Sequence, residues 1–149
     1  MMKIWKSFGE YILNLYDKRP VNIAEVGIGK FTMVYDFLNS QDGINIIKID
    51  IDPADETVVK DDITNPNPKL YENLDIIYSI RPPSEIQPYI LKLKKYNNAT
   101  IIIKPLFNED LNTGSVKMKL KNYKKSSFYI MWYLWLRKYW KNTILLKTV

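Results

Sequence analysis

Two glycines and a carboxylate stand where strands are expected to end, and together they point to a nucleotide-type pocket. Gly27 and Gly29 follow the apolar run Val21–Val26 and precede a segment with helical spacing. Glycine lets a backbone turn sharply and approach a ligand without a Cβ in the way. Asp50 ends a second apolar run, 21 residues after Gly29. A carboxylate there can accept hydrogen bonds from both hydroxyls of a ribose.

Further polar residues follow the third and fourth expected strands. At the third, a carboxylate of Asp61 or Asp62 would read the edge of an adenine, and Ile63 would cover its face. At the fourth, Arg81 is a permanent cation that either binds a phosphate or carboxylate of a substrate or forms a surface salt bridge. The order and spacing of the two glycines, Asp50 and residues 61–63 favour an adenosine-containing ligand.

The chain contains no cysteine and no histidine. This excludes disulfides, thiolate nucleophiles, imidazole bases and nearly all zinc chemistry, and we expect no metal. A mechanism through a covalent cysteine adduct is likewise excluded. Proton transfer would fall to carboxylates, lysine or tyrosine, and the candidates are Glu25, Asp61 and Tyr78.

Hydrophobic periodicity predicts strands that alternate with helices. The expected helices cover residues 2–17, 30–39 and 84–95, and the expected strands cover residues 21–26, 44–49, 57–60, 74–80 and 99–104. Two alternating segments, residues 116–120 and 128–133, flank the turn-like residues 122–125 and read as an antiparallel hairpin.

This alternation implies a mostly parallel sheet between two layers of helices. We predict one three-layer α/β domain of the Rossmann-like kind over residues 1–149. It would comprise an N-terminal helix (1–19), a nucleotide-binding core (20–113), and a basic, aromatic hairpin and tail (114–149). A ligand site is expected at the carboxyl ends of the strands, where the strand order reverses.

Four segments resemble, in order, the first four motifs of class I S-adenosylmethionine-dependent methyltransferases. They are EVGIGKF, IIKIDIDP, VKDDIT and NLDIIYSIRPP. The similarity spans roughly residues 20 to 133 and includes the terminal hairpin typical of that fold. More closely, the combination resembles a small uncharacterised archaeal family with a methyltransferase-like Rossmann core. The resemblance implies binding of S-adenosylmethionine or S-adenosylhomocysteine, by a small methyltransferase or by an inactive relative of one.

The resemblance also assigns roles by position. It places Glu25 near the methionine moiety, Gly27 and Gly29 in the glycine loop, Asp50 at the ribose, and Asp62 and Ile63 at the adenine. It places the methyl acceptor at the residues after the fourth strand, which are Ser79, Arg81, Pro82 and Pro83.

The chain departs from the family pattern at three places. Phe31 replaces the third glycine, so that the cleft beside the methionine moiety is expected to be tighter. The helix between the third and fourth strands is reduced to a loop rich in Asn and Pro. The segment SIRPPSE lacks the amide or carboxylate and the aromatic residue of amino-group methyltransferases. A dinucleotide-dependent oxidoreductase is a weaker alternative, because it would require glycine at Thr32 and would not explain Glu25.

Charge is distributed unevenly along the chain. Residues 1–110 hold 13 basic and 16 acidic residues, whereas residues 111–149 hold 9 basic and no acidic residues. Such a block indicates either a surface for a polyanion such as RNA or a solvated edge strand whose lysines prevent aggregation. RNA is therefore one candidate for the methyl acceptor. A non-enzymatic module that binds nucleic acid or protein is the alternative function.

Aromatic residues gather in the same region: Phe128, Tyr129, Trp132, Tyr133, Trp135, Tyr139 and Trp140. We favour a core role plus an interface between copies of the chain over base stacking or a membrane-surface role. The longest apolar run is about half of what a membrane span requires. With no signal-peptide pattern at the start, a cytoplasmic location is expected.

Overall fold

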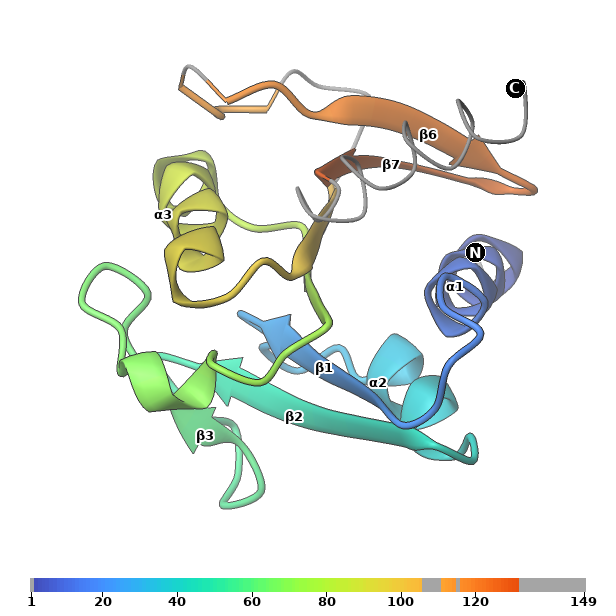
Figure 1. Ribbon diagram of the computed structural model, residues 1–149, viewed down its shortest axis with the longest axis horizontal. Helices are drawn as coiled ribbons and strands as arrows, with labels where there is room; N and C mark the ends of the chain where they lie inside the picture. Colours follow the sequence, from blue (N-terminus) through green and yellow to red (C-terminus); the bar gives the residue numbers. More distant parts are fainter. Residues whose placement is uncertain (1, 106–110, 115, 132–149) are drawn as a thin grey trace, which may run out of the picture.

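The computed structural model describes residues 2–105, 111–114 and 116–131 (Figure 1). Helices and strands alternate along the first two thirds of the chain, as predicted. In chain order the elements are α1 (Met2–Leu13), β1 (Val21–Val26), α2 (Met33–Asn39), β2 (Ile44–Asp50), β3 (Val59–Lys60), η1 (Pro68–Leu70), β4 (Ile76–Ile80), η2 (Ser84–Ile86), α3 (Gln87–Lys92), η3 (Leu93–Tyr96), β5 (Thr100–Lys104), β6 (Lys119–Tyr123) and β7 (Ser126–Met131).

The strands form one sheet in the order β3-β2-β1-β4-β5-β7-β6. β1 to β5 are parallel, and β7 lies antiparallel between β5 and β6. The central strands are nearly all apolar because helices cover both faces of the sheet; all five residues of β4 are buried. The predicted three-layer Rossmann-like fold with a C-terminal antiparallel hairpin is therefore confirmed. The strand order reverses between β1 and β4, which makes their carboxyl ends the expected place for a ligand.

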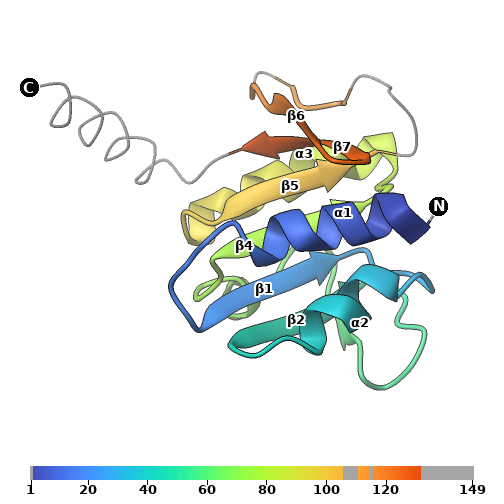
Figure 2. The same cartoon turned by 90° about the vertical axis from the view of Figure 1, so that its right-hand side faces the viewer.

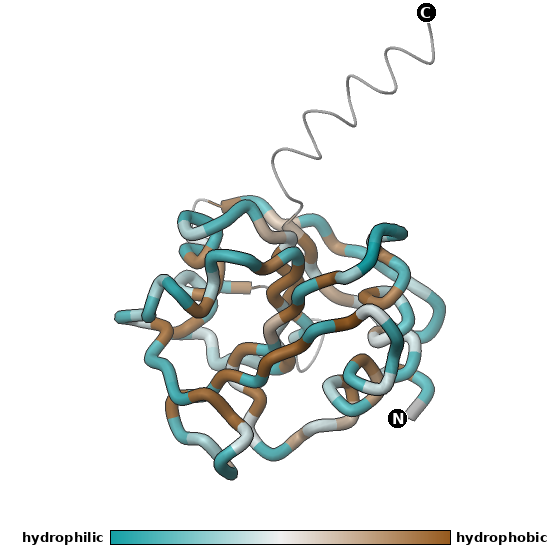
Figure 3. Tube along the Cα trace, turned by 60° about the horizontal axis from the view of Figure 1, so that its bottom comes forward, coloured by the Kyte–Doolittle hydropathy of each residue, from teal (hydrophilic) through white to brown (hydrophobic). Residues whose placement is uncertain are grey.

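Two apolar cores fill the space between the sheet and its helices. On one face, α1 and α2 pack side by side (Figure 2). Phe8 of α1 forms T-shaped ring contacts with Tyr78 and Phe128. On the other face, α3 packs over a core that includes Tyr71 and Ile101. Figure 3 shows the apolar stretches along the inner strands and the hydrophilic ones in the outer loops. In the described residues, no helix is long and apolar enough to cross a membrane.

Helix α1 ends at Leu13, four residues before the predicted end at residue 17. The Arg19 guanidinium donates hydrogen bonds to the carbonyl oxygens of Leu13 (2.8 Å) and Tyr16. These bonds satisfy carbonyl groups that the end of a helix leaves without partners. The chain then leaves the helix axis, and the Tyr16 hydroxyl hydrogen-bonds to Thr100 at the start of β5.

The predicted hairpin is present, but its turn is shorter than expected. Tyr123 pairs with Ser126, so the turn consists of Lys124 and Lys125 alone, with Lys124 in the left-handed region (φ 50°). The polar residues of β6 look like loop in the sequence because this strand forms the solvated edge of the sheet. The tip is fixed to α1, since Lys124 forms a 2.8 Å ion pair with Glu10 and the Lys125 amide donates to the Ser7 hydroxyl.

Candidate functional site

The glycine loop lies at the carboxyl end of β1 and presents an exposed backbone. Gly27 (φ +69°) and Gly29 (φ +58°) both adopt the left-handed conformation that favours glycine. The Gly27 amide donates to the Ile49 carbonyl of β2 (2.8 Å), which ties the loop to the neighbouring strand. A Cβ added to Gly29 would have no other heavy atom within 4 Å. The loop therefore faces open space above the two strands.

Asp50, the last residue of β2, points at this loop. One carboxylate oxygen accepts a 2.8 Å hydrogen bond from the Gly29 amide, and the other accepts a 2.9 Å bond from the Asp52 amide. The structure thus brings together the two groups on which the sequence prediction depends. Because each carboxylate oxygen has two lone pairs, Asp50 can accept further hydrogen bonds from a ligand.

The helix after the loop begins later than predicted. Residues 30–39 were expected to be helical, but α2 covers only Met33–Asn39. Thr32 precedes the helix, and its hydroxyl donates to the Asp36 carboxylate (2.9 Å) but accepts no hydrogen bond from a backbone amide of the first turn. Phe31 and Thr32 therefore lie outside the helix, and the Phe31 ring contacts the Trp5 ring of α1.

The acidic loop after β3, which begins with Asp61 and Asp62, is joined to Asp50 by a backbone hydrogen bond. The Asp61 amide donates to the Asp50 carbonyl (3.2 Å). The side chains have separate partners. The Asp62 carboxylate accepts bonds from the Thr64 hydroxyl and amide, which lower its pKa. The Asp61 carboxylate accepts bonds from the Tyr71 hydroxyl (2.6 Å) and the Asn67 amide (3.1 Å). Asp61 therefore holds this loop in shape.

Glu25 and Tyr78 are cross-strand neighbours on β1 and β4, and both are fully buried. The Tyr78 hydroxyl donates a hydrogen bond to Glu25 Oε1. Burial raises the pKa of Glu25 to about 8, although the hydrogen bond from Tyr78 acts in the opposite direction. Burial also raises the pKa of Tyr78 well above its ordinary value. Tyr78 belongs to the core on the α1 face and Tyr71 to the core on the α3 face, so the structure does not bring Asp61 to this pair.

The residues after β4 divide into buried and exposed members. Ser79 is buried, and its hydroxyl donates to the Val26 carbonyl (2.7 Å) at the end of β1. Pro82 is buried, and its carbonyl accepts a 3.1 Å bond from the Gln87 side chain. Arg81 and Pro83 are exposed. The Arg81 guanidinium lies over the rings of Phe31 (5.0 Å from carbon ζ to the ring centre) and Trp5 (5.6 Å).

Trp5 is the residue at this edge that the sequence analysis missed. It lies in the first turns of α1, and in Figure 2 the N-terminal end of that helix lies at the same end of the molecule as the arrowheads of β1 and β5. Trp5 precedes Phe8 by three residues, and this helical spacing was the available signal. Its contact with Phe31 and Arg81, in contrast, joins three segments that are remote in sequence.

The strand order, the terminal hairpin and the glycine loop beside a carboxylate define a class I methyltransferase-like Rossmann fold. Known structures agree. An S-adenosyl-L-methionine methyl transferase from Silicibacter pomeroyi superposes with a TM-score of 0.53 at 10% identity, covering 87% of this chain and 92% of that one. The antibiotic-resistance methyltransferase Kmr superposes with a TM-score of 0.51 at 8% identity, covering 76% and 86%. At these identities the likeness concerns the fold alone.

The chain belongs to the uncharacterised protein family UPF0146, whose model matches residues 5–132. A relative from Methanocaldococcus jannaschii is 48% identical over 117 residues, which cover 72% of this chain and 81% of the relative. The predicted membership of a small archaeal family with a methyltransferase-like core is thereby confirmed.

Proposed function

We propose that this chain binds S-adenosylmethionine at the carboxyl ends of β1, β2 and β3, as a small methyltransferase or as an inactive relative of one. The observation that carries the proposal is the Asp50 carboxylate, which lies 2.8 Å from the Gly29 amide at the end of β2. A carboxylate beside an exposed left-handed glycine loop suits the ribose of an adenosine. The methyltransferase folds of the structural neighbours support the same choice of ligand.

The residues present fit this cofactor. Asp50 would accept hydrogen bonds from the ribose hydroxyls, and the exposed Gly27 and Gly29 leave room for the ligand beside the backbone. Ile63 is partly buried and would cover the adenine, with Asp62 at its edge. Bound S-adenosylmethionine would supply an activated methyl group on a sulfonium, and alignment of the acceptor with it can provide much of the rate.

Proton removal from an acceptor would have to use groups of this site. Glu25 lies two residues before Gly27 and forms a buried pair with Tyr78. With a pKa of about 8, it is protonated at neutral pH and can accept a proton only in more alkaline solution. If Glu25 is the base, methyl transfer to an amine or hydroxyl therefore rises with pH toward 8.

Isothermal titration with S-adenosylmethionine and S-adenosylhomocysteine tests the proposal. We expect saturable heat with both ligands, together with a rise in melting temperature, because a ligand that binds the folded state stabilises it. Absence of heat and of thermal shift at millimolar ligand would refute cofactor binding. Binding of a nicotinamide dinucleotide in its place would favour the oxidoreductase alternative. Transfer of a labelled methyl group to RNA or protein fractions then separates an enzyme from a binding protein.

Gly29→Ala is expected to weaken binding of S-adenosylmethionine more than it destabilises the fold. The left-handed φ of Gly29 makes alanine cost about 1 kcal/mol of stability, and the added methyl group would project into the open space proposed for the ligand. Gly43→Ala is the control for a positive φ outside the site, although it should cost more stability because the added Cβ would lie 2.8 Å from the Arg19 side chain. Gly43 also has a positive φ (+74°), but it lies in the turn before β2, at the opposite end of that strand. Equal affinity losses in the two variants would contradict the placement of the ligand.

A second function, binding of RNA by the terminal hairpin, has its own support. Lys117, Lys119, Lys124 and Lys125 are exposed, and residues 111–131 contain no acidic residue. Within the described residues, the only ion pair that these four lysines form with a carboxylate is that of Lys124 with Glu10. Trp132, Tyr133, Trp135, Tyr139 and Trp140 lie outside the described residues, whereas Phe128 is part of the core. An interface between copies through the aromatic segment therefore stays a prediction.

Replacing Lys119 and Lys121 by Gln is expected to weaken binding of single-stranded RNA and to flatten its salt dependence. Each phosphate contact that is lost should reduce the slope of log K against log salt by about 0.7. The paired change Lys18→Gln and Lys69→Gln removes the same charge from two exposed positions outside the hairpin. Binding that ignores salt, or equal slopes in the two double variants, would count against the hairpin.

A further inference from the structure

We propose that Arg81, Trp5 and Phe31 form a binding site for an oxyanion, a phosphate or a carboxylate, that belongs to the substrate. The assignment to a substrate rests on the proposed function, because the site adjoins the glycine loop. The anion site itself rests on the geometry of these three side chains.

The two rings form a platform under the guanidinium. The ring centres of Trp5 and Phe31 are 4.7 Å apart, and the planes are inclined by 54°. Arg81 lies within 5.6 Å of both centres, with its side chain exposed above the mostly buried Trp5. Contact with aromatic faces restricts the guanidinium and leaves its N–H edges for a partner. Among the residues that the structure describes, no carboxylate forms an ion pair with Arg81.

The backbone holds Arg81 in this place at a conformational cost. Arg81 has φ +53°, in the left-handed region that non-glycine residues rarely adopt. Its amide donates a 2.7 Å hydrogen bond to the Lys104 carbonyl of β5, and the buried Ser79 hydroxyl ties the end of β4 to β1. Strained residues of this kind are concentrated at ligand sites.

Trp5 supplies a donor that lacks an acceptor. Trp5 is only 8% exposed, and its indole N–H is buried. This N–H has no hydrogen-bond partner in the described part of the chain. Buried donors are nearly always paired, so the unpaired N–H of the ring over which the Arg81 guanidinium lies indicates an acceptor that a ligand would bring. We infer that the anion accepts two bonds from the fork of Arg81 and one from the indole.

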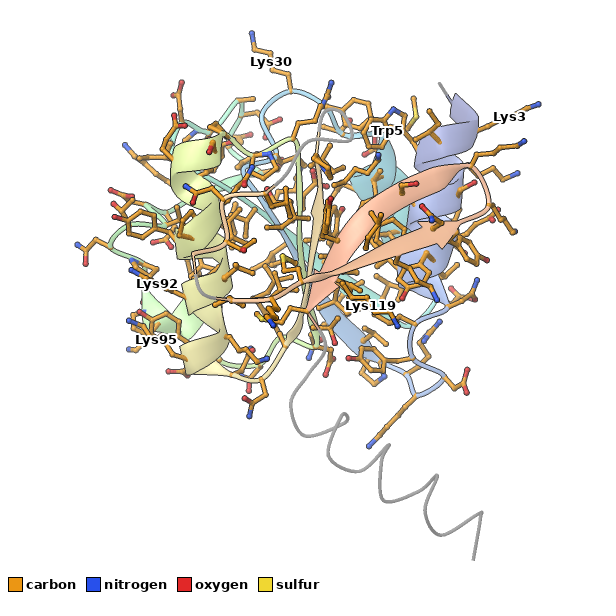
Figure 4. All side chains as sticks on the ribbon, turned by 90° about the horizontal axis from the view of Figure 1, so that it is seen from above. Lys3, Trp5, Lys30, Lys92, Lys95 and Lys119 are labelled. Carbon is orange, nitrogen blue, oxygen red and sulfur yellow. The ribbon has the colours of Figure 1, made fainter. Side chains whose placement is uncertain are left out.

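The surroundings favour a negatively charged group and place it near the proposed cofactor. Phe31 follows Gly29 by two residues, so the platform begins where the glycine loop ends. In Figure 4, Trp5 lies on the same side of the molecule as Lys30 of that loop and Lys3 of α1, whereas Lys92 of α3 and Lys95 of η3 lie away from it. An anion held there would anchor a substrate beside the methyl donor.

The test uses inorganic phosphate and acetate as probes, titrated at constant ionic strength. The readout is the ¹⁵N–¹H resonance of the Trp5 indole, identified by its disappearance in Trp5→Phe. We expect a saturable shift with at least one probe. Arg81→Ala should abolish it, and Arg81→Lys, which keeps the charge but loses the fork, should weaken binding about tenfold. Lys92→Ala, a charge change at an exposed position of α3 away from Trp5 (Figure 4), should leave the shift intact.

Two results would overturn the proposal: a Trp5 resonance that does not respond saturably to either probe, or the same response in Arg81→Ala as in the unmodified protein. A response to phosphate alone assigns a phosphate-bearing substrate, and a response to acetate alone assigns a carboxylate. Titration of the same samples with S-adenosylmethionine keeps the two proposals apart. An anion response without cofactor binding leaves this site in place and removes the proposed function. Cofactor binding without an anion response supports the proposed function and removes the anion site.

Discussion

Asp50→Asn is expected to weaken binding of S-adenosylmethionine at least about a hundredfold, because two charge-assisted hydrogen bonds to the ribose hydroxyls would be lost. The variant also changes the loop. In the unmodified protein, the Asp50 carboxylate accepts hydrogen bonds from the backbone amides of Gly29 and Asp52, one on each oxygen. An asparagine amide has a single acceptor oxygen, so its NH₂ group would face one of these two donors.

Isothermal titration measures the affinity, and urea unfolding separates it from stability. Asp52→Asn is the matched control, since it removes the same charge from an exposed side chain two residues further along the same loop. We expect it to retain cofactor binding. If Asp50→Asn binds as tightly as the unmodified protein, Asp50 does not hold the ribose and the proposed site is wrong.

Glu25→Gln is expected to remove most of the pH dependence of stability between pH 4.5 and 8. Folded Glu25 keeps its proton up to a pKa of about 8, whereas the unfolded chain releases it near the ordinary value of 4.5. Between these values unfolding releases a proton, so the free energy of unfolding falls as the pH rises, by at most about 1.4 kcal/mol per pH unit. The stabilisation is complete below pH 4.5 and lost above pH 8.

Glutamine stays neutral at every pH and can still accept the hydrogen bond from Tyr78. The variant should therefore match the unmodified protein in acid and exceed its stability in alkaline solution by several kcal/mol. Urea unfolding at a series of pH values measures this difference. Glu72→Gln, at an exposed position before β4, should leave the pH dependence unchanged. If the free energy of unfolding depends on pH in the same way in Glu25→Gln and in the unmodified protein, Glu25 is ionised in the folded state.

The fold could be predicted from local patterns because the central strands carry their own signal. β1, β2, β4 and β5 are apolar runs bounded by turn residues, and buried parallel strands require such runs. Edge strands carry less information. In β6, Lys119, Leu120 and Asn122 are exposed, and the sequence predicted a turn at Asn122 and Tyr123 although these residues pair with Ser127 and Ser126.

The geometry of the candidate site was predictable where backbone conformation or strand ends determine it, as at Gly29 and Asp50. It was not predictable where side chains from distant segments meet. Arg81, Phe31 and Trp5 are contributed by β4, the glycine loop and α1, and no spacing in the sequence relates them. The partner of Asp61 was not predictable either. Asp61 was a candidate proton acceptor, but its carboxylate accepts a hydrogen bond from Tyr71, and this contact depends on how the loop after β3 folds.

The attachment of the terminal hairpin to α1 has a consequence for biosynthesis. Phe8 and Tyr11 of α1 pack against Phe128 of β7, and the tip of the hairpin is bonded to Ser7 and Glu10. On the ribosome the first helix is made more than a hundred residues before these partners. The part of its apolar face that packs against β7 must therefore remain uncovered, or be shielded by a chaperone, until β7 has left the exit tunnel. Only then can the nascent chain complete its native packing.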